Sequence, residues 1–175
     1  MIVYLDTGVF VDFFSQRSTI ALTLRRESRR GRSVQKIQED ANSVMHLLQS
    51  HEPMTSVIAI LEYKDNTYNE LKSSFKGLED IRIENIMKNK SEAYAMFLRC
   101  QRNGIELEPI HTGILQGALT NPEYDELEID DAIHIETARN KGAKIVISTD
   151  SGLIRFDRAF DGIRIVDTDQ ALTLL

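Results

Sequence analysis

The stretch EIDDAIHIETARNKGAKIVISTD, residues 128–150, predicts a helix that leads directly into a strand. An aspartate is expected to cap the start of this helix. Gly142 is expected to end it, because glycine readily adopts the left-handed conformation found at helix ends. The run KIVIST, residues 144–149, has the apolar centre of a strand that is buried on both faces. Asp150 follows at once, so a carboxylate stands at the end of a buried strand.

The beginning of the chain repeats this arrangement. IVYL, residues 2–5, predicts a short buried strand, and Asp6 comes directly after it. A buried strand gains nothing from an unpaired carboxylate, because desolvating the charge is costly. Asp6 therefore either caps the helix predicted from Gly8 to Phe14, or is held in place by the strand for a function.

The rest of the chain continues the alternation of strands and helices. Further strands are predicted at Met54 and Thr55 and at residues 163–166. Helices are predicted over residues 39–51, after an N-cap at Ser56, twice between Asn66 and about Asn103, and at 114–119, where a turn is the alternative. This alternation favours a parallel sheet covered on both faces. We therefore expect an α/β protein, a three-layer α/β/α sandwich with a central, mostly parallel sheet, enlarged by helical insertions.

The domain organisation follows from length and composition. A chain of 175 residues is long enough for one domain with a substantial core, and its 9 glycines and 3 prolines form no linker. We expect a single domain over residues 1–175. It would carry a basic insertion around 15–40 and a helical insertion around 65–125.

Composition also bears on the cellular compartment. Hydrophobic residues make up 42% of the chain and charged residues 27%, as in ordinary soluble globular proteins. Cys100 is the single cysteine, so no intramolecular disulfide can form, which favours a reducing compartment. No apolar run approaches the length of a membrane span. We expect a cytoplasmic protein.

The charge is distributed unevenly. The formal net charge is −6, yet residues 17–36 hold seven basic side chains and one acid, Glu27. A basic patch on an acidic body fits a surface that binds nucleic acid or an acidic partner. It fits a solvated insertion equally well. Composition alone leaves both alternatives open.

Four acids have comparable places in the predicted fold. Asp6 and Asp150 follow buried strands, and the carboxyl ends of parallel strands are where such sheets carry their sites. Asp131 lies in the first turn of a predicted helix, and Glu62 lies inside the helix that follows Ser56. Carboxylates that crowd together repel one another unless a cation neutralises them. Oxygen ligands of this kind suit hard ions such as Mg²⁺ or Mn²⁺.

Each acid taken alone also has a structural explanation. Asp131, or its neighbour Asp130, could cap a helix. Asp150 could form an Asx turn, and Glu62 could be an exposed charge. One metal site would account for all four acids in this order. We therefore favour it over a separate structural role for each acid.

The segments that carry these acids resemble the successive motifs of PIN-domain nucleases, especially VapC-like members. The similar segments are IVYLDTGVFVDFF (2–14), TSVIAILEY (55–63) and DDAIHIETARNKGAKIVISTDSGL (130–153), and the similarity covers somewhat less than half of the chain. Asp131 is followed by the alanines that open and continue the family's third motif. Gly8 departs from the family, which usually has Asn or Ser there.

The resemblance implies a compact parallel α/β sandwich that binds Mg²⁺ or Mn²⁺ and hydrolyses RNA as an endoribonuclease. In such an enzyme Asp6, Asp131 and Asp150 would contact the ion. Glu62 would hold the ion or a bound water. Ser56 and Thr149 would orient the carboxylates.

The partners expected on this basis are RNA, an antitoxin protein and a second copy of the chain. The enzyme would be either the toxin of a toxin-antitoxin pair or an RNA-processing factor. The residues expected to contact the RNA backbone come from the basic stretch: Arg25, Arg26, Arg29, Arg30 and Arg32.

The alternative is a catalytically inactive PIN-like module that binds RNA or protein, in which the acids serve folding or ion binding. Other classes fit less well. A haloacid-dehalogenase phosphatase needs an Asp where Gly8 stands, and the chain has neither a P-loop nor a GxGxxG fingerprint. The histidines show no zinc-ligand spacing, and His134 is expected to pack or hydrogen-bond on its own helix.

Overall fold

The computed structural model of the chain describes residues 1–14, 31–63 and 82–175. In these ranges five strands form one sheet in the order β3-β2-β1-β4-β5, and each neighbouring pair is parallel. The strands are β1 (Ile2–Leu5), β2 (Glu52–Ser56), β3 (Glu106–Glu108), β4 (Ile145–Ile147) and β5 (Arg164–Val166). The predicted α/β class with a central parallel sheet is confirmed.

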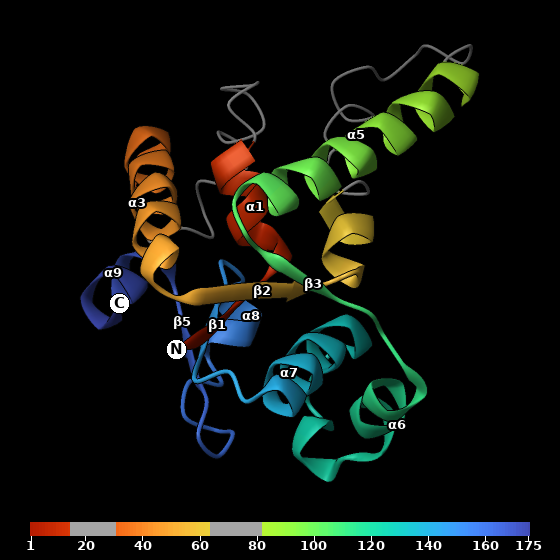
Figure 1. Cartoon of the computed structure of the whole chain (residues 1–175). Coiled ribbons are helices and arrows are strands. Elements are labelled where there is room, and N and C mark those ends of the chain that lie inside the picture. The colour runs from red at the N-terminus through yellow and green to blue at the C-terminus, as the bar shows by residue number, and fades with distance from the viewer. Residues whose placement is uncertain (15–30, 64–81) are drawn as a thin grey trace.

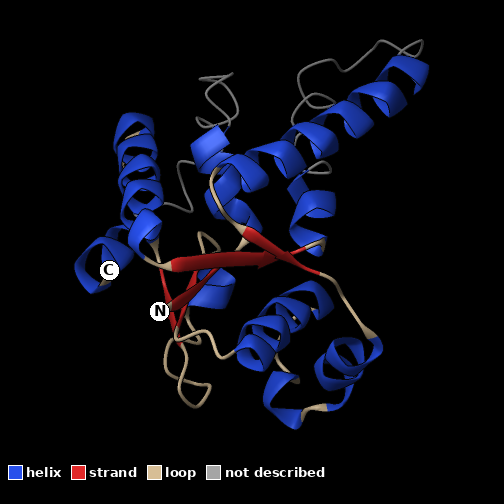
Figure 2. Ribbon diagram, in the orientation of Figure 1, coloured by secondary structure: helices blue, strands red, loops and turns tan. Residues whose placement is uncertain are grey.

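Helices cover both faces of the sheet, so the strands lie between two helical layers (Figure 2). One face carries α1 (Thr7–Phe14), α3 (Val34–Leu47), α5 (Arg82–Arg102) and α9 (Thr168–Leu174). The other carries α6 (Thr112–Thr120), α7 (Ile129–Lys141) and the single-turn α8 (Ser151–Ile154). Residues 58–63 are also helical, and Leu48–Ser50 and Pro122–Tyr124 form 3₁₀ turns.

Alternation along the central strands divides the core in two. Val3 and Leu5 of β1 pack with the first group of helices, whereas Tyr4 packs with the second. Ile145 and Ile147 of β4 likewise face away from Val146. Because successive side chains point to opposite faces, a strand covered on both sides must be apolar throughout. This explains the unbroken runs in IVYL and KIVIST.

The order of the strands places a site at the middle of the sheet. From the central strand β1 the chain moves outward to β2 and β3, and then returns by α6 and α7 to β4 on the other side of β1 (Figure 1). The strand order therefore reverses between β1 and β4. Open α/β sheets bind their ligands in the crevice beyond the carboxyl ends of such a pair.

Both ranges predicted as insertions contain parts of this framework. Within 15–40, α3 begins at Val34 and buries Ile37 against its neighbours. Within 65–125, β3 is an edge strand of the sheet and α6 packs against α7. Residues 15–30 and 64–81 lie outside the described part of the chain, including one of the two helices expected between Asn66 and Asn103.

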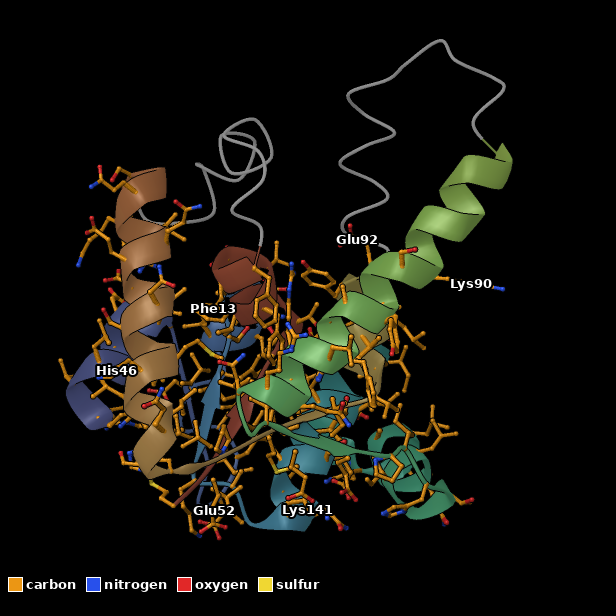
Figure 3. The ribbon with its side chains drawn as sticks, turned by 45° about the horizontal axis from the view of Figure 1, so that its top comes forward. Phe13, His46, Glu52, Lys90, Glu92 and Lys141 are labelled. Carbon is orange, nitrogen blue, oxygen red and sulfur yellow. The ribbon has the colours of Figure 1, made fainter. Side chains whose placement is uncertain are left out.

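The long helix α5 contacts the body through its C-terminal half. Met96 and Cys100 are fully buried there. Nearer its start, Lys90 and Tyr94 are exposed, and Figure 3 shows Lys90 pointing away from the sheet. None of the helices in the described ranges is long and apolar enough to cross a membrane.

Two predicted helix caps are wrong. Glu128, not an aspartate, precedes α7, and its side chain forms no capping bond; Asp130 and Asp131 lie in the first turn instead. Ser56 is the last residue of β2, and Val57 separates it from the helix at 58–63. The predicted end of α7 is confirmed, since Gly142 has a φ of 76°.

Candidate metal centre

Asp6 lies at the end of β1, and the neighbouring strand holds its carboxylate. The backbone N–H of Thr7 donates to Oδ1 at 2.7 Å, and the hydroxyl of Ser148 donates to Oδ2 at 2.6 Å. Ser148 follows β4, so the two central strands are joined at their carboxyl ends. A standard cap would bond the second or third amide of α1, not the first. The side chain is 7% exposed and is held in position.

Glu62 reaches the same place from the helix at 58–63. Its Oε2 accepts a hydrogen bond from the hydroxyl of Thr7 and lies 2.9 Å from Nε2 of His134. The same Nε2 lies 3.6 Å from Oδ1 of Asp6. One potential ligand atom from each of Asp6, Glu62 and His134 lies within 4.8 Å of the other two.

His134 is buried and bonded to other elements, so the prediction that it packs or bonds on its own helix is wrong. Its Nδ1 lies 2.6 Å from the hydroxyl of Tyr4, and that hydroxyl accepts the amide hydrogen of Ser56 at 3.1 Å. One signal in the sequence indicated this place. His134 is three residues after Asp131, so both lie on one face of α7.

Asp131, in the first turn of α7, lies within electrostatic reach of Asp6 and Asp150. Burial raises the pKa of Asp131, and the charges of Asp6 and Asp150 raise it further, to about 7. Burial also raises the pKa of Asp6, and the charge of Glu62 adds to this, although His134 and the hydroxyl of Ser148 oppose it. The structure thus crowds acids together at an energetic cost to their ionised forms.

Glu62 and His134 relieve part of this cost by pairing. Burial alone would raise the pKa of Glu62, but the hydrogen bonds from His134 and Thr7 lower it. Burial disfavours a charge on His134, yet the oxygen of Tyr4 and the carboxylates of Glu62 and Asp6 raise its pKa well above the usual range. The ring is therefore a source of positive potential inside the acidic cluster.

Asp150 has a structural role as well as a place in the site. Its Oδ1 accepts the amide hydrogen of Gly152 at 2.7 Å and so caps α8, as the structural alternative predicted. Its own amide donates to the hydroxyl of Ser148 at 3.0 Å. Its charge also raises the pKa of Asp131, so Asp150 both caps α8 and acts electrostatically on another acid of the site. Ser148, which links Asp150 to Asp6, was missed by the sequence analysis.

Thr149 explains why position 8 is a glycine. A Cβ on Gly8 would lie 1.8 Å from the hydroxyl oxygen of Thr149 and 3.1 Å from its Cβ, so the side chain of Thr149 would have to move. The hydroxyl from the loop after β4 thus occupies the space that a side chain at position 8 would need. The hydroxyl of Thr149 thus lies beside the position at which the resemblance expects a polar side chain.

The hydroxyl of Ser56 does not contribute as expected. It is fully buried and has no hydrogen-bond partner among the described residues. Its backbone amide contributes instead, through the bond to Tyr4. Ser56 therefore affects the site indirectly, because its amide bonds the hydroxyl of Tyr4 and that hydroxyl bonds His134.

The basic stretch is described only at its end. Arg32 is 12% exposed and forms ion pairs with Asp40 at 2.9 Å and Asp167 at 2.5 Å. A guanidinium held by two buried carboxylates is not free to contact RNA, which contradicts that part of the prediction. The other four predicted contacts lie outside the described residues: Arg25, Arg26, Arg29 and Arg30.

The donor set fits a hard divalent cation. Each carboxylate oxygen of Asp6 keeps a lone pair beyond its one hydrogen bond, and the other acids add further oxygen donors. An added positive charge would also offset the mutual repulsion that raises the pKa of Asp131. No known family model matches the chain, and no curated protein matches it by sequence.

Proposed function

We propose that this protein is a divalent-metal-dependent endoribonuclease with a PIN-like fold. The observation that carries the proposal is the cluster of Asp6, Glu62 and His134, whose potential ligand atoms lie within 4.8 Å of one another at the point where the strand order reverses. The charges of Asp6 and Asp150 raise the pKa of Asp131, which supports a place for these two further acids beside the cluster. Acids brought together beyond the carboxyl ends of two central parallel strands, with one of them buried and another of strongly raised pKa, are typical of a site that binds a cation.

Each side chain has a distinct role in this proposal. Asp6, Asp131 and Asp150 would hold Mg²⁺ or Mn²⁺ through their oxygens. The bound ion supplies a water of lowered pKa and neutralises charge on the phosphate. Thr7 and His134 donate hydrogen bonds to Glu62 and lower its pKa, so Glu62 is suited to orient that water as a charged acceptor.

The proposed reaction is hydrolysis of an RNA phosphodiester bond. Attack of water on phosphorus, in line with the leaving oxygen, would give a 5′-phosphate and a 3′-hydroxyl. The arginines at positions 25, 26, 29 and 30 are proposed to contact the RNA backbone, since Arg32 is engaged elsewhere. Such an enzyme would act as a toxin controlled by an antitoxin protein, or as an RNA-processing factor.

The test is cleavage of end-labelled, single-stranded RNA with Mg²⁺, with Mn²⁺ and with EDTA. Wild type should cut only with a metal ion. Asp6→Asn keeps the shape of the side chain but weakens ion binding. It should lower the rate by about 100-fold or more, because even residues outside the ligand sphere cost about 10–100-fold when lost. Asp130→Asn is the matched control, since Asp130 is exposed on the first turn of α7.

Three outcomes separate the alternatives. Metal-dependent cutting that is lost in Asp6→Asn and kept in Asp130→Asn supports the nuclease. Folded wild type that binds Mg²⁺ in calorimetry but leaves varied RNAs uncut supports an inactive binding module. Cutting that persists in EDTA contradicts the proposed role of the acids.

A further inference from the structure

Four groups form a buried chain of hydrogen bonds that ends at Glu62. The amide of Ser56 donates to the oxygen of Tyr4, the hydroxyl of Tyr4 bonds Nδ1 of His134, and Nε2 of His134 bonds Glu62. Tyr4 is 0% exposed and His134 1%. The two bonds of Tyr4 are therefore shielded from water, and the bond to Glu62, whose side chain is 24% exposed, is partly shielded. Protein groups thus fix the hydrogen between Tyr4 and His134.

The phenol of Tyr4 decides where the ring hydrogen lies. Its oxygen already receives a hydrogen from Ser56, and its own hydrogen needs an acceptor. Within the part of the chain that the structure describes, the recorded acceptor is Nδ1 of His134, at 2.6 Å. A ring that accepts at Nδ1 carries its hydrogen on Nε2, where Glu62 lies at 2.9 Å.

The ring has two other protonation states. One of them also places a hydrogen on Nε2, and the other is unfavourable. A doubly protonated ring also has a hydrogen on Nε2, directed at Glu62. A ring with hydrogen on Nδ1 alone would turn the lone pair of Nε2 toward a carboxylate oxygen at 2.9 Å, and the hydroxyl of Tyr4 would lose its acceptor. Only that unfavourable state could bind a metal ion through Nε2.

We propose that His134 is a positioning residue, which holds Glu62 in the acidic cluster by donating Nε2–H, and that it is not a metal ligand. In the neutral ring the hydroxyl of Tyr4 keeps Nδ1 as the acceptor, so the hydrogen stays on Nε2. The ion would then be bound by oxygen atoms alone, which favours Mg²⁺ or Mn²⁺ over Zn²⁺. The role of Glu62 in this proposal rests on the proposed ribonuclease function. The hydrogen position on His134 does not.

The first test measures that hydrogen directly. Nitrogen-15 spectra of the histidine rings distinguish a protonated Nε2 from a bare or metal-bound one. The signals of His134 are identified by their loss in His134→Gln. We expect Nε2 of wild type to stay protonated in EDTA and after saturation with Mg²⁺. A bare Nε2 in EDTA, or loss of its hydrogen when Mg²⁺ binds, overturns the proposal.

The second test compares variants that keep or remove the donor. The amide of glutamine can donate from about the place of Nε2, whereas alanine cannot. We expect His134→Ala to lower kcat by about 10–100-fold with little change in KM for RNA. We expect His134→Gln to lie closer to wild type and to keep its Mg²⁺ affinity in calorimetry. A folded His134→Gln that is as slow as His134→Ala, or that no longer binds Mg²⁺, contradicts positioning.

The two tests separate the failure of this inference from that of the proposed function. If wild type cuts no RNA, the nuclease proposal fails, and the spectra still decide where the hydrogen lies. If wild type cuts RNA but its Nε2 is bare, the nuclease proposal stands and His134 becomes a ligand. Tyr4→Phe is a further check, because it should allow the second ring state to appear in the spectra.

Discussion

At the residue scale, the surroundings of Asp131 in the candidate site disfavour its ionised form. Its pKa is raised to about 7 by burial and by its acidic neighbours. The folded protein therefore holds this proton more tightly than the unfolded chain does. It follows that Asp131 lowers stability progressively as the pH rises from about 4 to about 7, and by a constant amount above that.

Replacing Asp131 should therefore stabilise the metal-free protein. In EDTA at pH 8, we expect Asp131→Asn to melt roughly 2–4 °C above wild type, a modest gain because the side chain is partly exposed. The difference should shrink at pH 5 and vanish near pH 4. Melting curves at these pH values measure it.

A control on the same turn makes this result specific. Asp130→Asn removes an exposed acid from the N-terminal turn of α7, where a negative charge is mildly favourable. It should not stabilise the protein at any pH. Equal gains from both variants would mean that general charge repulsion, not the cluster, raises the pKa of Asp131.

A second contact at this scale joins Gly8 to Thr149. Alanine at position 8 would ordinarily stabilise α1, yet its Cβ would overlap the hydroxyl of Thr149. We expect Gly8→Ala to destabilise the protein by about 1–3 kcal/mol, as overpacking does. In a Thr149→Ala background only the Cβ at 3.1 Å remains, and the cost should be much smaller.

A double-mutant cycle with these two changes measures the contact. Urea denaturation of the two single variants and the double variant gives the coupling free energy. Residues in contact usually couple by about 0.5–3 kcal/mol. Strict additivity would show that the hydroxyl of Thr149 does not occupy the space beside Gly8.

At the scale of elements, Arg32 joins the start of α3 to α9. Ser33 caps α3, and Asp167 caps α9. Arg32 bonds Asp167 and also Asp40, in the second turn of α3. Both carboxylates are almost completely buried, and the guanidinium is the one charged group among the described residues that bonds both of them.

Removing this guanidinium should be costly for stability. Arg32→Gln leaves two buried carboxylates with incomplete compensation, and we expect a loss of about 3 kcal/mol in the free energy of unfolding. Lys36→Gln is the matched control, because Lys36 bonds the same Asp40 but is 56% exposed. Urea denaturation should show a clearly smaller loss for the control. Similar losses for both would contradict a structural role for Arg32.

At the scale of the whole molecule, the sheet brings the candidate site together. Asp6 and Asp150 come from adjacent strand ends, Asp131 from the start of α7, and Glu62 from the helix after β2. These segments span almost the full length of the chain. They meet because the strand order reverses beside β1, and the carboxyl ends of β1 and β4 bring these loops and helix starts together.

The sequence by itself determined the elements and the acids. Unbroken apolar runs indicate strands that are buried on both faces, and helical periodicity indicates the helices that pack on the sheet. Gly142 indicates the end of a helix. Each of these patterns is local in the sequence. The four acids could be found because they follow such patterns at fixed offsets. The edge strand β3 could not, since three residues with two glutamates carry no strand pattern.

Only the tertiary structure decided which side chains act together. Tyr4 reads as an ordinary core residue, and His134 is 130 residues away in the sequence, yet they share a hydrogen bond. Arg32 belongs to a basic run in the sequence but is paired with buried acids in the fold. Gly8 departs from the motif of the family that the sequence resembles, and only the structure shows the side chain of Thr149 beside it. Hydrogen bonds, ion pairs and steric exclusion act over a few ångströms in space. No local pattern in the chain records which distant residues will come that close.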